Sequence, residues 1–104
     1  MNNKMDTFRY LVGGYYGIAE MDNYDLKEFI LKDINDYIKD FVLENFDDTF
    51  DYGEEFKKVE DELSVKTKLQ DSLLVLQKID APLELILLVK QRLKEIREEE
   101  IGKF

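Results

Sequence analysis

Apolar side chains recur at helical intervals across residues 24–45. Their positions are Leu26, Ile30, Ile34, Tyr37, Ile38 and Phe41. Side chains three and four positions apart lie on the same face of an α-helix, so this spacing indicates a helix with one buried face. Asp22 or Asn23 can accept hydrogen bonds from the free amide groups of the first turn. The pattern therefore predicts a helix over residues 24–45, capped by one of these two side chains.

A second helical pattern occupies the C-terminal residues. Its apolar positions are Leu85, Ile86, Leu88, Val89, Leu93 and Ile96. Asp80 can cap this helix, and Pro82 suits its first turn because an N–H group there has no helical partner to lose. Gly102 is placed to end the helix. The acidic run 98–100 opposes the helix dipole, so we expect the last turn to fray.

Residues 54–79 contain two apolar rows that do not join smoothly. The first row is Phe56, Val59 and Leu63, and the second is Val65, Leu69, Leu73, Leu76 and Ile79. A strand over residues 63–69 is the alternative, since apolar positions alternate there, but the longer rows favour helix. We predict a helical segment with a break near Ser64. Residues 72–89 then form an αα-hairpin about the turn 80–82.

Both arms of this predicted hairpin are rich in aliphatic residues at its closed end. Such a surface either forms part of the buried core or joins two copies of the chain. We favour the core. The alternative is a homodimer with a seam through Leu85 and Leu88.

The N-terminal segment is ambiguous because Gly13-Gly14 interrupts two apolar runs. A Gly-Gly pair between such runs is typical of a β-hairpin turn. Alternatively, Asp6 or Thr7 caps a short helix that Gly13 ends. We favour the helix, since an isolated hairpin is marginally stable in water and the rest of the pattern is helical. Residues 1–104 therefore predict one all-α domain, a small bundle of about four helices.

The composition limits which cellular locations and which kinds of chemistry we expect for the protein. There is no Cys and no His among the 104 residues, so disulfides, thiolates, and the commonest general base and metal ligand are absent. The first ten residues lack the apolar core of a signal peptide, and the longest apolar run, 85–89, is too short to span a bilayer. We therefore expect a cytoplasmic protein. Frequent Lys, Asn, Ile and acidic residues suggest an AT-rich coding sequence, as in a low-GC bacterium or its phage.

The sequence holds no pattern that indicates catalysis or a bound cofactor. Ser64 and Ser72 lack an adjacent base, and the glycines at 13, 14 and 17 lack the Lys-Ser or Lys-Thr of a phosphate loop. Two carboxylates would suffice for a glycosidase, but such pairs arise easily in a chain with 24 acidic residues. The acidic stretch 47–55 fails the EF-hand spacing because aromatic residues occupy ligand positions. We expect no enzyme activity, no cofactor and no metal site.

Charge is distributed unevenly along the chain. Residues 20–62 hold 16 acidic residues and five Lys, a net charge of −11, whereas the remaining residues sum to +2 and give the total of −9. Binding to nucleic acid or to an anionic membrane needs clustered cations, so neither is expected. A basic protein partner fits this charge, because opposite charges steer association. Solubility alone is the plain alternative.

At about 100° per residue, the predicted helix turns one set of side chains away from its core face. They are Asp25, Phe29, Asp33, Asp36, Asp40 and Leu43. Phe29 and Leu43 are unusual on a charged face, and Asp36 and Asp40 place like charges one turn apart at a small energetic cost. A cationic partner would offset this cost. Alternatively, the cost is tolerated and the N-terminal segment covers Phe29.

The residues after this helix repeat the combination of acids and aromatic rings. Here the acids are Asp47, Asp48 and Asp51, and the rings are Phe46, Phe50 and Tyr52. Aromatic side chains supply binding energy at interface centres and the acids around them supply steering, so the three acids and Tyr52 join the candidate partner-binding residues. For Phe46 and Phe50 we favour the alternative that the rings fill one end of the bundle.

Two functional hypotheses follow from these observations. The first is a protein-binding inhibitor that occludes a basic partner, such as a nuclease toxin or another nucleic-acid-handling enzyme. Immunity proteins, antitoxins and phage anti-defence proteins work in this way. The alternative is a structural or adaptor subunit that self-associates through its C-terminal hairpin, with the acids serving solubility.

Overall fold

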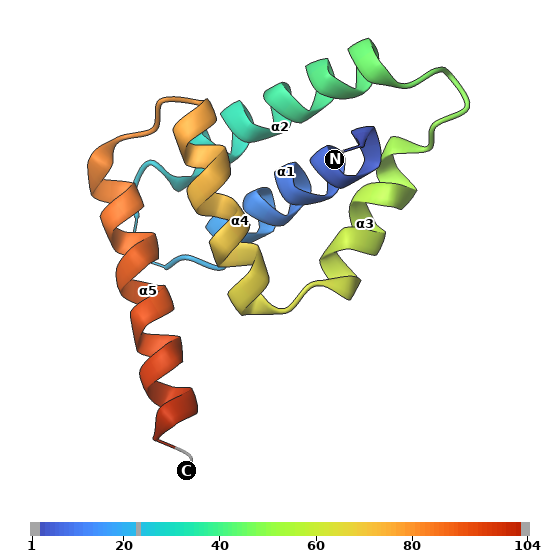
Figure 1. The fold of residues 1–104 in the computed structure, drawn as a ribbon. Helices are drawn as coiled ribbons and strands as arrows, with labels where there is room; N and C mark the ends of the chain where they lie inside the picture. Colours follow the sequence, from blue (N-terminus) through green and yellow to red (C-terminus); the bar gives the residue numbers. More distant parts are fainter. Residues whose placement is uncertain (1–2, 23, 103–104) are drawn as a thin grey trace.

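The computed structural model describes residues 3–22 and 24–102, and within these residues the chain is all-α (Figure 1). The described part has five helices and no strand: α1 (Lys4–Ala19), α2 (Lys27–Asn45), α3 (Tyr52–Glu62), α4 (Val65–Lys78) and α5 (Leu83–Ile101). The prediction of an all-α fold is confirmed. The count exceeds the expected four, and the β-hairpin considered for the N-terminal segment is wrong, since α1 runs through both of its glycines. None of the described helices combines the length and apolarity needed to cross a bilayer.

Helix α1 lies at the centre of the fold. It packs against α2, α3 and α4, and α5 packs chiefly on α4 (Figure 1). The apolar side chains with no exposed surface come from all five helices: Phe8, Leu11, Val12, Ile18, Ile34, Ile38, Val59, Leu69, Val75, Leu76, Leu85 and Val89. The hydrophobic core is therefore built around one helix.

Three glycines allow α4 to lie directly against α1. Gly13, Gly14 and Gly17 are all buried. A Cβ atom on Gly17 would lie 2.3 Å from the Lys68 carbonyl oxygen, and one on Gly14 would lie 2.4 Å from the Val75 side chain. Close approach of two backbones requires residues without side chains. The expectation that Gly13 ends the helix is therefore wrong. Gly13 lies inside α1, where it allows close packing against α4.

The start of α1 also differs from the prediction. Asn3 is the N-cap, and its Oδ1 accepts a hydrogen bond of 2.8 Å from the Asp6 amide. Asp6 and Thr7, the two predicted caps, lie inside the first turn. Asn, Asp and Thr side chains can all accept this hydrogen bond, so residue type alone does not show which of Asn3, Asp6 and Thr7 is the N-cap.

Helix α2 begins three residues later than the predicted start at residue 24. Leu26 occupies the N-cap position, without a capping hydrogen bond from its side chain. The predicted cap Asp22 is thus wrong, and the alternative cap Asn23 lies outside the described residues. The predicted end at Asn45 is confirmed.

The predicted break in the third helical segment is confirmed and separates α3 from α4. Ser64 caps α4, and its hydroxyl accepts a hydrogen bond of 3.2 Å from the Thr67 amide. Asp51 caps α3 in the same way, with 3.1 Å to the Glu54 amide.

Helices α4 and α5 form the predicted αα-hairpin and run in opposite directions (Figure 1). Asp80 has a left-handed backbone with φ of 51°, and the next amide, of Ala81, donates to the Leu76 carbonyl at 3.0 Å. This bond closes the C-terminus of α4. Asp80 therefore ends α4 and does not cap α5, whose N-cap position is Pro82. Gly102 follows the last helical residue, as predicted.

Candidate protein-binding site

The side of α2 that faces away from α1 carries a line of exposed residues, which we call the acidic stripe. Its members are Phe29, Asp33, Asp36, Asp40 and Leu43, and all five are exposed. Their spacing of four, three, four and three residues keeps them on one side of the helix over about 21 Å. The stripe therefore has an apolar residue at each end and three carboxylates between them.

Burial of the opposite side of α2 explains why these residues point outward. Ile30, Ile34 and Ile38 retain 6%, 0% and 0% of their exposure. Because the helix has 3.6 residues per turn, the positions half a turn away must face solvent. Tyr37 and Ile38 were both expected on the buried face, but only Ile38 is buried, and Tyr37 is 38% exposed.

The apolar ends of the acidic stripe are more exposed than one expects for such side chains. Phe29 is 69% exposed and Leu43 is 81% exposed. The alternative in which the N-terminal segment covers Phe29 is therefore wrong. Isolated exposed apolar residues are common, but an exposed phenyl ring at the end of a row of carboxylates suits a surface that another molecule covers.

The carboxylates of the stripe are only partly neutralised. The Lys32 ammonium lies 3.3 Å from an Asp36 carboxylate oxygen. Within the described residues, Asp33 and Asp40 form no ion pair. Two unneutralised charges thus flank one that is shared with a lysine on the same helix.

The remaining predicted acids do not belong to this row. Asp25 is exposed in the turn before α2. Asp47 accepts hydrogen bonds from the hydroxyl and amide groups of Thr49, which lower the pKa of its carboxyl. Asp51 caps α3, and Asp48 is exposed in the loop between α2 and α3. Two of these four acids therefore have local structural roles.

Tyr52, a predicted partner-binding residue, has an internal role. It is half-buried and its hydroxyl donates a hydrogen bond of 2.6 Å to Asn35 Oδ1. Burial, with a smaller contribution from Tyr15, raises the pKa of Tyr52 to about 12. The side chain links α3 to α2 and leaves little surface for a partner.

The aromatic residues after α2 fill one end of the molecule, as we predicted for Phe46 and Phe50. The Phe46 and Phe50 rings stack with centroids 4.1 Å apart. Phe8 of α1 meets both rings edge-on, with centroids 6.3 and 5.2 Å away. Most aromatic rings of the acidic half therefore pack internally, whereas Phe29 on the outer side of α2 does not.

The C-terminal hairpin places its apolar residues differently from the predicted seam. Leu85 is fully buried within its own chain, whereas Leu88 is 37% exposed. Leu83, Leu87 and Ile101 are more exposed, at 68%, 55% and 66%. Sequence reasoning missed these three because it followed the buried face of α5. The signal that could have found them is their helical spacing, which places these three residues and the charged residues between them on the outer side of α5.

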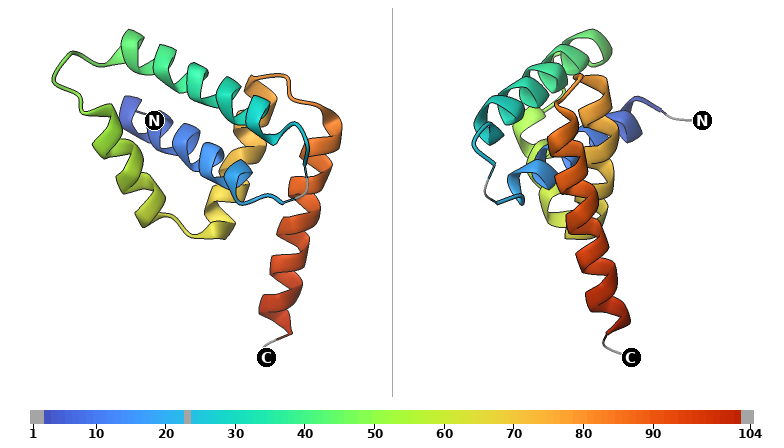
Figure 2. Two further views of the ribbon diagram at one scale, coloured as in Figure 1. Left: turned by 180° about the vertical axis from the view of Figure 1, so that it is seen from behind. Right: turned by 90° about the vertical axis from the view of Figure 1, so that its left-hand side faces the viewer.

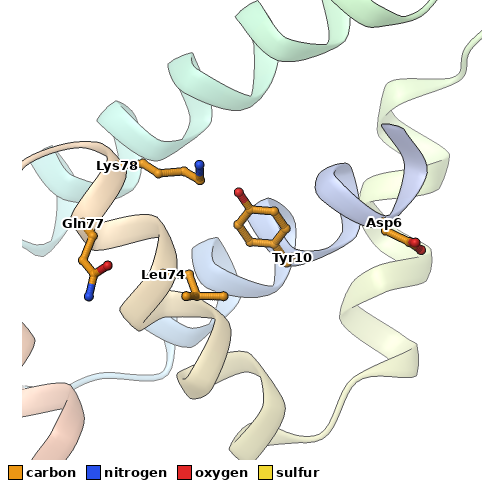
Figure 3. A pocket seen from close by; sticks show the side chains of 5 residues that line it. All are labelled: Asp6, Tyr10, Leu74, Gln77 and Lys78. Atoms are coloured by element: carbon orange, nitrogen blue, oxygen red, sulfur yellow. The ribbon is translucent and has the colours of Figure 1, made fainter. Parts of the chain in front are cut away.

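A surface groove between α1 and α4 was also not predicted. It has a volume of about 570 Å³ and is lined by Asp6, Tyr10, Leu74, Gln77 and Lys78 (Figure 3). The Lys78 ammonium points toward the Tyr10 hydroxyl, and hydrogen bonding to this hydroxyl raises the pKa of Lys78. The groove is open and its charges are of both signs, so it lacks the enclosed apolar surface that small-molecule sites share.

Comparison of the chain with protein-family models, with curated proteins and with solved structures gave no match. The described residues contain no group of three or more acidic side chains arranged to hold a metal ion. The geometry of the surface is thus the basis for a functional proposal.

Proposed function

We propose that this protein acts by binding a basic protein through the acidic stripe of α2. It would be an inhibitor of the immunity, antitoxin or phage anti-defence type, which occludes a cationic surface of its partner. A nuclease or another nucleic-acid-handling enzyme is the partner class that this charge suits best. The carboxylates of Asp33, Asp36 and Asp40 rise by about 4.5 and 6 Å along the helix, a spacing that can imitate a row of phosphates.

The exposure of Phe29 at the end of a row of carboxylates is the observation that supports this proposal most directly. A ring that is 69% exposed can bury most of its area against a partner. Burial of an aromatic side chain supplies binding energy, and the surrounding charges supply steering and reject partners of the same sign. A face that served only solubility would carry charges without the ring.

The experiment compares capture of basic proteins by immobilised wild type and by a stripe variant. Asp33→Lys, Asp36→Lys and Asp40→Lys are combined in one chain. We expect the variant to lose a basic protein that the wild type retains and inhibits, with an unchanged melting temperature. A matched control combines Glu54→Lys, Glu60→Lys and Asp61→Lys on α3, three exposed positions with the same change in charge. Equal capture by wild type and stripe variant would contradict the proposal.

A structural or adaptor subunit is the second candidate function. Leu83 and Leu87 favour it, since two leucines one turn apart are 68% and 55% exposed on the C-terminal hairpin. Such a subunit would associate with further copies through α5. The position of the surface differs from the predicted seam, since Leu85 is buried within the chain.

A further inference from the structure

The outer side of α5 carries a second row of exposed residues, which we call the basic stripe. Its members are Leu87, Lys90, Lys94, Arg97 and Ile101, and all five are exposed. The spacing of three, four, three and four residues keeps them on one side of α5 over about 21 Å. Like the acidic stripe, it has apolar residues at both ends and three charges between them.

The two stripes match when one is reversed. Read from its C-terminus, the basic stripe has the spacing four, three, four and three, which is the spacing of the acidic stripe read from its N-terminus. Antiparallel alignment therefore brings together five pairs: Phe29 with Ile101, Asp33 with Arg97, Asp36 with Lys94, Asp40 with Lys90, and Leu43 with Leu87. A parallel alignment that keeps the spacing places Asp33 against Leu87 and Leu43 against Arg97. Each of these pairs sets a charged side chain against an apolar one, so the antiparallel alignment is favoured.

From this complementarity we propose that the basic stripe of one copy docks antiparallel on the acidic stripe of a second copy. Alternating intervals of three and four residues are the spacing at which two helices interlock side chains along a shared seam. Each end of the seam would then bury an apolar pair, and each of the three central layers would pair opposite charges. The occupant of the α2 surface is thus another copy of this chain.

Five of the six charged groups of the two stripes form no ion pair within the described residues, and the sixth, Asp36, is shared with Lys32. Within the described part of the chain, Lys90, Lys94 and Arg97 form no ion pair, and neither do Asp33 and Asp40. By contrast, the neighbouring Arg92 lies within 3.8 Å of both Glu95 and Glu99. The unpaired cations of the basic stripe and the unpaired carboxylates of the acidic stripe therefore lie on two different helices of one molecule.

The arrangement of the helices leaves both stripes accessible. Helix α2 packs on α1, and helix α5 packs on α4, so α2 and α5 are both outer helices of the fold. Figures 1 and 2 show the C-terminal end of α5 extending clear of the other helices. Because the two stripes occupy different surfaces, docking is head-to-tail, and the second copy presents a further acidic stripe. Contacts of this kind form rings or open chains.

The association is expected to be weak. A contact between two single helix faces is smaller than the roughly 1,200–2,000 Å² that stable interfaces bury. The net charge of −9 also repels two copies at long range. Local pairing of the stripes must offset this repulsion, so oligomers should appear only as the protein concentration rises.

This inference goes beyond the proposed function, because it holds whether or not a foreign basic partner exists. The two are linked by competition for one surface: a copy that occupies the acidic stripe excludes a basic partner. Reversal of charge on the basic stripe should therefore abolish self-association and leave partner capture intact. Failure of one proposal is then distinguishable from failure of the other.

The first test is sedimentation of the purified wild-type chain over a wide range of concentration at physiological ionic strength. We expect the mean mass to rise with concentration. Either the acidic-stripe variant Asp33→Lys, Asp36→Lys, Asp40→Lys or the basic-stripe variant Lys90→Glu, Lys94→Glu, Arg97→Glu should weaken association on the order of 100-fold, because three attractive pairs become repulsive. The α3 control variant described above should associate at least as well as the wild type.

The decisive test is a charge swap between variants. Each variant alone should be monomeric, and an equal mixture of the two should associate again, because each restores opposite charges across the contact. Retained helicity and melting temperature in each variant exclude unfolding as the cause. A wild type that stays monomeric at every concentration would overturn the inference. Two further results would also overturn it: self-association that neither stripe variant weakens, and an equal mixture of the two variants that stays monomeric.

Discussion

The interior around α1 and the outer sides of α2 and α5 are built from similar sequence patterns but tolerate change very differently. Both use residues spaced three and four apart. Inside, Phe8 has no exposed surface and the glycines of α1 leave no room for a side chain. Outside, Phe29 and Leu87 are mostly exposed. Spacing therefore establishes which residues share a face, whereas the other helices determine whether that face is covered.

Truncation of Phe8 should have the largest effect on stability. Its ring is fully buried and meets Phe46, Phe50 and Tyr52 edge-on. We expect Phe8→Ala to lower the free energy of unfolding by about 3–5 kcal/mol, through lost burial and the cavity that remains. Urea denaturation followed by circular dichroism measures this change. A loss below about 1 kcal/mol would mean that the aromatic end is less tightly packed than described.

A methyl group at Gly17 should have the next largest effect. Its Cβ would lie 2.3 Å from the Lys68 carbonyl oxygen, a backbone atom that cannot turn aside. We expect Gly17→Ala to cost about 2–3 kcal/mol despite the better helix propensity of Ala. Gly53→Ala in α3 is the matched control, since the nearest atom lies 3.9 Å away. The control should be stabilised by up to about 1 kcal/mol, and destabilisation of both variants to the same extent would argue against a close α1–α4 contact.

Removal of the Asp71 charge should have a smaller effect and one that depends on pH. The carboxylate lies beside Gly13, where burial raises the pKa of Asp71 to about 6. At Asp71 the folded state then binds a proton more tightly than the unfolded state does. The contribution of this group to stability is therefore greatest below about pH 4 and is lost as pH rises through about 6. Because the group is half exposed, we expect Asp71→Asn to gain only about 1 kcal/mol at pH 7.

Unfolding of wild type and Asp71→Asn between pH 4 and pH 7.5 measures this difference. The gain from the substitution should grow as pH rises through the window and be near zero at its acid end. A gain of equal size at every pH would show that the carboxylate is not the cause.

The smallest effect on stability is expected for Phe29, although its ring equals Phe8 in size. We expect Phe29→Ser to change the free energy of unfolding by less than about 0.5 kcal/mol, because its ring is 69% exposed. The same change should weaken self-association and partner capture. Thermal unfolding and sedimentation together separate the two effects. A large loss of stability would show that the Phe29 ring belongs to the core, and the contrast between the interior and the outer side of α2 would then be wrong.

The outer side of α2 could be predicted from the sequence, because one strong apolar row sets the rotation of the helix. Phe29 and Leu43 were placed correctly on the outer side for this reason. A helix was also favoured for the N-terminal segment, but its continuation past Gly13 could not be predicted in the same way. Gly13 and Gly14 favour turns locally, and only the position of α4 shows that they serve close packing. The covering helix is a long-range feature that a local pattern does not contain.

The basic stripe was missed for a related reason. Leu87 and Ile101 were not counted in the apolar row of α5, and the cations between them are ordinary residues on a solvated helix. The structure shows Leu85 fully buried and Leu87 55% exposed. The acidic loop shows the reverse case, since Asp47 and Asp51 looked like partner-binding residues but bond to their own backbone.

The dependence of α5 on a single neighbour has a consequence for how the molecule opens. Three helices enclose α1, whereas α5 packs chiefly on α4. Opening of α5 therefore breaks its packing on one helix, and hydrogen exchange should find its amides less protected than those of α1. An opened α5 would also expose Leu85 and Val89, so the helix that presents the basic stripe can uncover a buried apolar face when it opens.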